Sequence, residues 1–235
     1  MALPKITRPE YSTTVPSTGK KIKYNPFTVR EEKVLMLAAE GQESEEIINA
    51  VTNCLEACVT SPNDFKVADL ALFDIEYLFL KMRSKSVGEM IQLVVTDPSD
   101  ETFKVEHEIN IDKIGVKKTA GHKEVIDITP EVKVKMRYPG IDFFTEGIDV
   151  SNVKSSVDVI AKCIHQIVTE EEVFERADMT DAEIREWIED LTQSQFSDLS
   201  NFITSMPRLS HSITLRNTNT KKDFTVKLEG LADFF

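Results

Sequence analysis

The apolar residues change their spacing near residue 88, and this change constrains the fold more than any short motif does. Before it, residues 43–59 carry apolar side chains at helical spacing, and residues 66–83 are apolar on almost every side, which is typical of a helix at the centre of a bundle. After it, residues 102–111 alternate between apolar and polar side chains, as a strand with one buried face does. Helices and strands that occupy separate runs of the chain predict an α+β fold.

The expected elements follow one another in four blocks. Residues 1–27 are rich in proline and show little periodicity, which predicts an extended N-terminal arm. Three helices come next, and the first begins at a capping box over residues 28–31. The strands of a small antiparallel sheet are then expected at 88–97, 102–111, 123–128 and 132–138. Helical spacing returns after residue 140, and a β-hairpin over residues 211–230 ends the chain.

We therefore predict an α+β fold with an N-terminal arm and three helices, a small antiparallel sheet, and a helical C-terminal half closed by a terminal β-hairpin. The helices of that half are expected from apolar spacing between Val153 and Val168 and from a capping box at Thr180 and Glu183. The arm spans residues 1–27. Because the final hairpin can pair with the earlier sheet, residues 28–235 are expected to form a single domain, with 140–151 as the alternative sub-boundary.

The composition favours an acidic protein with reduced cysteine thiols that binds neither nucleic acids nor membranes. The 235 residues carry a formal net charge of −12, and an acidic surface repels phosphate backbones. No run of 18 apolar residues predicts a membrane span, and the N-terminus lacks the apolar core of a signal peptide. Cys54, Cys58 and Cys163 form no Cys-x-x-Cys pair, which favours free thiols in a cytoplasmic setting.

The segment STTVPSTGKKIKYNPFTVREEK contains a Gly-Lys pair that could be mistaken for a phosphate-binding loop. Such a loop needs a second glycine five positions before Gly19, where Thr14 stands, and a Ser or Thr where Lys21 stands. Pro16 and Gly19 instead suit the corners of a turn. The segment therefore predicts a turn that leads through an extended stretch into a capped helix.

Candidate catalytic and metal-binding residues do not converge in the sequence. The four histidines are scattered, His122 is expected to be solvated in a polar loop, and no His or Cys cluster has the spacing of zinc ligands. No nucleophile elbow or dinucleotide fingerprint is present. We expect no catalytic, metal or cofactor site and no enzymatic activity.

Two alternatives remain open at this point. A small acidic hydrolase could use paired carboxylates, and it predicts a deep pocket with at least two convergent acidic groups. A protein that contacts nucleic acid through Lys20, Lys21 and Lys23 is the weaker alternative, and it predicts steeply salt-dependent DNA binding.

Three stretches carry a resemblance to a known family: the turn PSTGK, the start of a helix in YNPFTVREEK, and the helix-to-strand junction LFLKMRSKSVGE. They resemble the baseplate hub assembly proteins, or hub assembly chaperones, of T-even-type bacteriophages, over about the first 95 residues. The resemblance implies a non-enzymatic role in virion morphogenesis, with other baseplate hub and tail proteins as partners. It places the protein in the host cell cytoplasm during assembly, with the virion tail baseplate as the further location.

One feature of that family is missing from this chain. Many of its members place cysteine pairs, as in a small zinc ribbon, in the hairpin that corresponds to residues 88–111. This chain has VVTDPSDETFKVE there and no cysteine, so the resemblance implies no zinc in this hairpin.

The N-terminal arm is the expected partner-binding segment. Ile22, Tyr24 and Phe27 would supply apolar anchors, while Lys20 and Lys21 would supply steering charge, through strand addition or binding in a groove. The alternative is that the arm folds back over the helices of its own chain. The sequence leaves the oligomeric state open.

Overall fold

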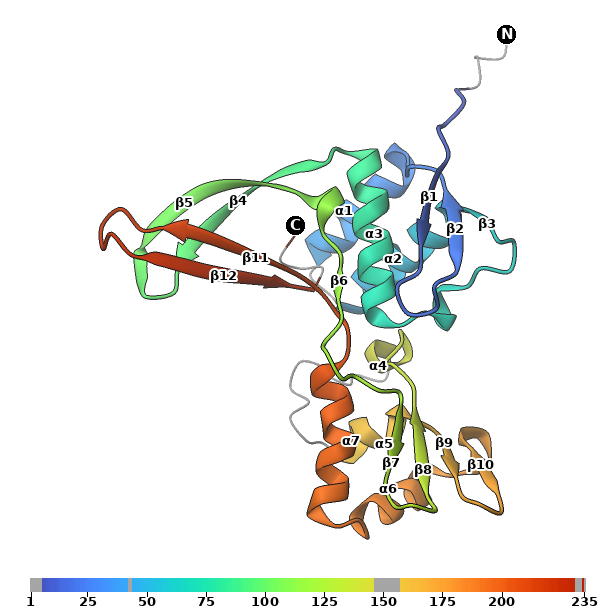
Figure 1. Ribbon diagram of the computed structural model, residues 1–235. Coiled ribbons are helices and arrows are strands. Elements are labelled where there is room, and N and C mark those ends of the chain that lie inside the picture. The colour runs from blue at the N-terminus through green and yellow to red at the C-terminus, as the bar shows by residue number, and fades with distance from the viewer. Residues whose placement is uncertain (1–5, 42–43, 146–156, 231–233, 235) are drawn as a thin grey trace. The chain divides into compact units, whose positions relative to one another are not determined.

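The computed structural model describes residues 6–41, 44–145, 157–230 and 234. The contacts between its residues divide the chain into two compact units, which are described separately below (Figure 1). Unit 1 comprises Met1–Lys117 and Arg208–Phe235, and unit 2 comprises Lys118–Pro207. Unit 2 is therefore one continuous segment inserted into the sequence of unit 1. The strands of unit 1 that flank it in sequence, β6 (Val116–Lys117) and β11 (Arg208–Arg216), pair with each other.

Unit 1 begins with a β-hairpin rather than with the extended arm that the sequence predicted. Strands β1 (Tyr11–Thr14) and β2 (Lys21–Tyr24) pair antiparallel, and β3 (Val59–Ser61) pairs with the other edge of β2. The arm prediction failed because two strands of only four residues each are too short to be recognised as a pair before their partner is known.

Three helices lie beside this hairpin in unit 1, as expected. They are α1 (Val29–Gly41), α2 (Ser44–Cys58) and α3 (Leu72–Ser86), and the 3₁₀ turn η1 (Val67–Asp69) precedes α3. Helix α3 is the central one, since Leu78, Phe79, Leu80 and Met82 are almost completely buried on several sides of it. This matches the prediction of a helix that is apolar nearly all round.

A buried carboxylate holds the turn between β1 and β2 against the start of α3. Asp74, in the first helical turn, is fully buried and accepts hydrogen bonds from the Ser17 amide at 2.9 Å, the Ser17 hydroxyl, and the Ala71 amide at 3.2 Å. Negative charge is stabilised at a helix N-terminus by the unpaired amides and the helix dipole. The turn itself uses Gly19 at φ +70°, in the left-handed region that glycine adopts without strain. The Pro-Ser-Thr-Gly-Lys segment thus binds a carboxylate of its own chain.

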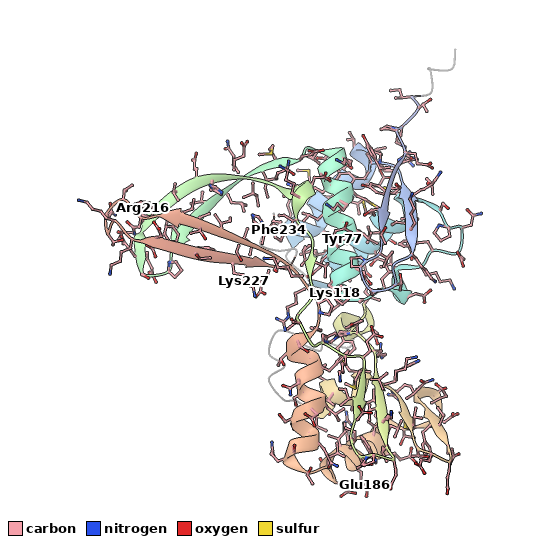
Figure 2. All side chains as sticks on the ribbon, in the orientation of Figure 1. Tyr77, Lys118, Glu186, Arg216, Lys227 and Phe234 are labelled. Carbon is pink, nitrogen blue, oxygen red and sulfur yellow. The ribbon has the colours of Figure 1, made fainter. Side chains whose placement is uncertain are left out.

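Two long hairpins form the remainder of unit 1. One joins β4 (Met90–Asp97) to β5 (Asp100–Asn110), and η2 (Ile111–Lys113) follows it. The other joins β11 to β12 (Asp223–Glu229), with β6 on the outer side of β11. Their apolar faces share one core with α3, which includes Ile109, Ile213 and Phe224. Figure 2 labels Tyr77 and Phe234, which belong to this core, and Arg216, which marks the end of β11.

A buried polar cluster joins the ends of these two hairpins. Asn217, which is fully buried, donates its side-chain amide to Asp97 at 2.6 Å and to Asp100 at 3.2 Å. The Asn217 side-chain oxygen in turn accepts from the Asn219 and Thr220 amides. Because every partner in the cluster is hydrogen-bonded, it fixes the register between segments about 120 residues apart in the sequence.

Unit 2 packs its helices against a four-stranded antiparallel sheet of order β10-β9-β8-β7. The strands are β7 (Val125–Asp127), β8 (Lys133–Met136), β9 (Ile164–Val168) and β10 (Val173–Glu175). The helices are α4 (Asp142–Thr145), α5 (Val157–Cys163), α6 (Asp181–Glu189) and α7 (Gln193–Ser205), and η4 (Arg176–Asp178) precedes α6. Val134, Cys163, Ile164 and Leu199, all fully buried, lie at the centre of the core.

The fold is α+β, but the predicted arrangement is wrong. The described strands form four small antiparallel sheets instead of one, and strands rather than helices dominate the C-terminal part. The helical spacing assigned up to Val168 ends at Cys163, because Ile164–Val168 pairs as β9 between β8 and β10. Its β-branched residues suit a strand with partners on both sides, and that tertiary pairing overrides a weak helical pattern. The expected helix start at residue 151 lies outside the described residues.

The domain prediction stays a prediction. It expects a single domain over residues 28–235, which includes both compact units from residue 28 onward. The alternative boundary at 140–151 falls partly within residues 146–156, outside the described part of the chain.

The Asp74 contacts generate the first prediction. Asp74→Ala removes the acceptor of three hydrogen bonds and leaves buried donors without a partner, so we expect the free energy of unfolding to fall by roughly 3 kcal/mol. Asp69→Ala, at an exposed position just before α3, is the matched control and should change it by less than about 0.5 kcal/mol. Urea unfolding followed by circular dichroism measures both. Equal losses in the two variants would contradict the role given to Asp74.

Candidate functional site

The structure buries the three apolar residues that the sequence proposed as partner anchors. Ile22 and Tyr24 are 2% and 3% exposed, and Phe27 stacks on Phe79 of α3 with ring centroids 6.3 Å apart. The Tyr24 hydroxyl approaches the Lys81 carbonyl at 3.5 Å, and burial raises the pKa of Tyr24 to about 12. The chain therefore uses these side chains within its own core, which is the folded-back alternative.

The two lysines proposed with them are placed differently. Lys20 and Lys21 are exposed at the turn and at the start of β2. Lys23 is also exposed and pairs with Glu10 at 2.9 Å, which lowers the pKa of that carboxyl. Binding of a partner through Lys20, Lys21, Ile22, Tyr24 and Phe27 stays a prediction, and in this fold only the two lysines can reach a partner without unfolding the hairpin.

Helix α1 exposes most of its large apolar side chains, and sequence reasoning missed this. Val29 is 78% exposed, Met36 61%, Leu37 58% and Val34 48%, while Ala38 is the buried residue of the helix. Residues 29, 36 and 37 lie on one side of an α-helix, and residue 34 borders them. We call these four side chains the α1 surface. The exposed charged residues Lys33 and Glu40 lie among them on the same side of the helix. Exposed apolar side chains gathered on a helix and bordered by charged ones are typical of a protein-binding site, and methionine is enriched in such interfaces.

The start of α1 is fixed in position, so the direction of the α1 surface is fixed as well. One half of the predicted capping box forms, since the Thr28 amide donates to the Glu31 carboxylate at 2.7 Å. The Thr28 hydroxyl also donates to this carboxylate, and it accepts from the Arg30 amide at 3.3 Å. Partial burial acts to raise the pKa of Glu31, but the hydrogen bonds from Thr28 outweigh it and leave this pKa below its usual value. The Phe27 amide donates to Ser86 at the end of α3, at 2.9 Å. Hydrogen bonds to Glu31 and Ser86 thus hold the first residues of α1 in place.

Unit 2 contains a second candidate site, an open hollow of about 360 Å³ between β7 and α7. Side chains of α7 at residues 198, 201, 202 and 205 lie along it, and residues 125–127 of β7 form the opposite side. Asp127 and Asp198 line it, but both are exposed, and Asp127 pairs with Lys133 at 3.3 Å. This is not the deep pocket that the acidic-hydrolase alternative requires, so the hollow does not favour that alternative.

His122 lies between Gly121 and Lys123, which line this hollow, and it is held by hydrogen bonds, contrary to the expectation that it is solvated. Its Nδ1 lies 2.9 Å from the Ser205 hydroxyl and its Nε2 lies 2.9 Å from the Tyr138 hydroxyl. Its ring packs against Tyr138 and Phe202, with centroids 5.6 and 5.0 Å away. Since the Ser205 hydroxyl donates to the Asn201 carbonyl, the Nδ1–H of a neutral imidazole suits this position. The contact with Ser205 was not visible in the sequence because Ser205 lies 83 residues away.

In the described part of the chain, no three His, Cys, Asp or Glu side chains come together in a way that could hold a metal ion. None of the helices in these described ranges is both long and apolar enough to cross a bilayer.

A capped, firmly anchored helix that presents apolar side chains to solvent is a feature of proteins that bind other proteins. Comparison with family models identifies the group more closely: residues 8–235 match the family described as T4 bacteriophage base plate protein. The chain belongs to this family, which confirms the resemblance of its first 95 residues to baseplate proteins of T-even-type phages. Searches of curated proteins and of solved structures found no match.

The His122 contacts generate a prediction about pH. Burial lowers the pKa of His122, with Glu124 raising it and Lys118 lowering it to smaller extents. When the pH is below the usual histidine pKa of about 6.5, His122 binds a proton more readily in the unfolded chain than in the folded one. The free energy of unfolding of unit 2 should therefore fall as the pH drops from 7.5 to 5.5.

His122→Phe keeps the stacking and removes the titration, so its stability should change much less over the same interval. Urea midpoints at both pH values, followed by the fluorescence of Trp187, the chain's one tryptophan, measure this. Trp187 packs against the core of unit 2 and so reports on it. The same pH dependence in both proteins would contradict the assignment.

Proposed function

We propose that the chain is a non-enzymatic structural or assembly protein of the phage tail baseplate hub, which acts through protein–protein contacts during tail morphogenesis. Its membership of the baseplate family supports the baseplate part of this proposal, and the hub is proposed from the resemblance in its first 95 residues. The observation that carries the mode of action is the α1 surface.

The energetics of the α1 surface favour binding to an apolar partner surface. A large apolar side chain that is moved fully out of water contributes about 1.5–3 kcal/mol. The four side chains of the α1 surface are between 48% and 78% exposed, so a partner that covers them would gain on the order of 4–8 kcal/mol before the cost of association. That gain suits one part of a larger interface.

Partners and location follow from the same proposal. The partners are other hub and tail proteins of the phage, and the exposed Lys20 and Lys21 would steer acidic partners toward unit 1. Assembly takes place in the host cytoplasm, and the tail baseplate of the finished virion is the further location. Mass spectrometry of purified virions distinguishes a retained component from one that leaves after assembly.

The α1 surface generates a prediction about partner binding. Leu37→Glu places a charge at the centre of that surface, where its desolvation opposes burial, so we expect the tagged variant to recover about tenfold less hub protein from infected cells than the wild type. Val173→Glu, at a valine of β10 that is 50% exposed, is the matched control and should recover the wild-type amount.

Circular dichroism of both variants checks that they remain folded. The proposal fails if the wild-type protein recovers no baseplate protein, or if Leu37→Glu and Val173→Glu recover equal amounts.

A further inference from the structure

Strand β7 leaves one edge of the unit 2 sheet open. In the order β10-β9-β8-β7 it is an end strand, and among the described residues no strand pairs with its outer side. The Ile128 amide donates to the Val132 carbonyl at 2.9 Å, and the Met136 amide donates to the Glu124 carbonyl at 2.7 Å. Because backbone groups alternate in direction along a strand, the amides and carbonyls of Val125 and Asp127 point away from β8. This edge therefore offers a short row of backbone donors and acceptors to another strand.

The open edge borders the hollow, so a strand added there would have a groove for its side chains. On the α7 side, Asp198, Asn201, Phe202 and Ser205 recur at a spacing of three or four residues, as one stripe of a helix does. Phe202 is buried and forms an apolar part of the lining, and the partly buried Ile126 contributes from β7. A strand edge that faces a helix across a groove can bind an extended peptide, with backbone bonds for affinity and the groove for side-chain choice.

The charges of unit 2 indicate which peptide fits. Residues 118–207 contain nine basic and 18 acidic residues, whereas the remainder of the chain contains 19 basic and 22 acidic residues. Most of the net negative charge is thus in unit 2. At the groove itself, Asp127 is paired with Lys133, while no ion pair joins Asp198 to another described residue. Lys123 is the one basic residue among those that line the groove. Asp198 is therefore the position that favours a basic residue.

We propose that the groove between β7 and α7 binds an extended, basic segment of another protein as an added strand. The segment pairs with the backbone of Val125 and Asp127, places an apolar side chain against Phe202, and brings a Lys or Arg to Asp198. The proposal adds a second contact to the proposed function and rests on it for the source of the segment, which is another protein of the phage tail. Nucleic acid is disfavoured as occupant because the unit is acidic.

A proline substitution tests the backbone part of this proposal. At an edge strand, proline removes the outward amide without breaking the ladder on the other side. Val125→Pro should therefore keep the pairing of β7 with β8 and abolish a hydrogen bond to the peptide. Val173→Pro is a matched control, since Val173 is similarly exposed and lies on β10, the opposite end strand of the same sheet. The backbone amide of Val173 points outward at the edge of the sheet opposite to the groove.

The probes are two synthetic peptides with blocked ends, Val-Lys-Val-Lys-Val and Val-Glu-Val-Glu-Val, titrated into the purified full-length chain. By nuclear magnetic resonance, the basic peptide should shift and protect the amides of Val125 and Asp127, and the acidic peptide should bind about tenfold more weakly. Val125→Pro should lower the affinity for the basic peptide about tenfold, and Val173→Pro should leave it unchanged.

A charge substitution tests the proposal independently of any effect of proline on folding. Asp198→Asn should weaken binding of the basic peptide about threefold and reduce its salt dependence, whereas Glu186→Gln on the exposed side of α6 should not. Figure 2 labels Glu186 on unit 2.

Several results would overturn the proposal. They are no binding of the basic peptide by the wild type, equal losses in Val125→Pro and Val173→Pro, or a dimer that forms without peptide and is lost in Val125→Pro, which would assign the edge to a second copy. Recovery of hub proteins through the α1 surface is a separate measurement. The groove proposal can therefore be contradicted while the proposed function is supported, and the proposed function can be contradicted while the groove proposal is supported.

Discussion

The carboxylate of Asp74 joins the first strands of the chain to its central helix, and the arrangement of unit 1 depends on this contact. A charged group with no exposed surface is stable only if its hydrogen bonds replace the water that it loses. Ser17 and Ala71 supply those bonds at the N-terminus of α3, where the helix dipole also favours a negative charge. With the turn fixed there, Ile22 and Tyr24 enter the core, and the chain reaches Phe27 and Thr28 in the position from which α1 starts. The Asp74 contact holds the hairpin, and the hydrogen bond between Phe27 and Ser86 holds the start of α1 beside it.

Local signals in the sequence predicted those parts of the structure that neighbouring residues determine. The capping box at Thr180 forms as expected, half of the one at Thr28 forms, and residues 102–111 lie in a strand, because each depends on side chains three or two positions apart. Long-range contacts could not be predicted. The pairing of Asn217 with Asp97 and the docking of Ser17 on Asp74 join residues that no spacing rule connects. Ile164–Val168 was assigned to a helix because its strand partners lie elsewhere in the chain.

The candidate site shows the same limit more sharply. The sequence identified an apolar segment near the N-terminus but could not say which of its faces the chain covers. Ile22 and Tyr24 were predicted from the sequence to bind a partner, but they are buried. Met36 and Leu37 are residue types that are common in protein cores, but they are exposed. Exposure is a property of the packed fold, so an apolar helix alone does not distinguish a core from an interface. The baseplate family and the α1 surface together support the view that this chain binds other proteins, and the groove between β7 and α7 is the proposed second contact.

The most direct test of this account is amide hydrogen exchange of the full-length chain, alone and bound to a hub protein recovered with it. The account assigns the N-terminal hairpin to the core and the outer side of α1 to the interface. It predicts that residues 11–24 are protected already in the free chain and unchanged on binding, while residues 29–41 gain protection. An unprotected hairpin that becomes protected on binding, with no change in residues 29–41, would contradict it.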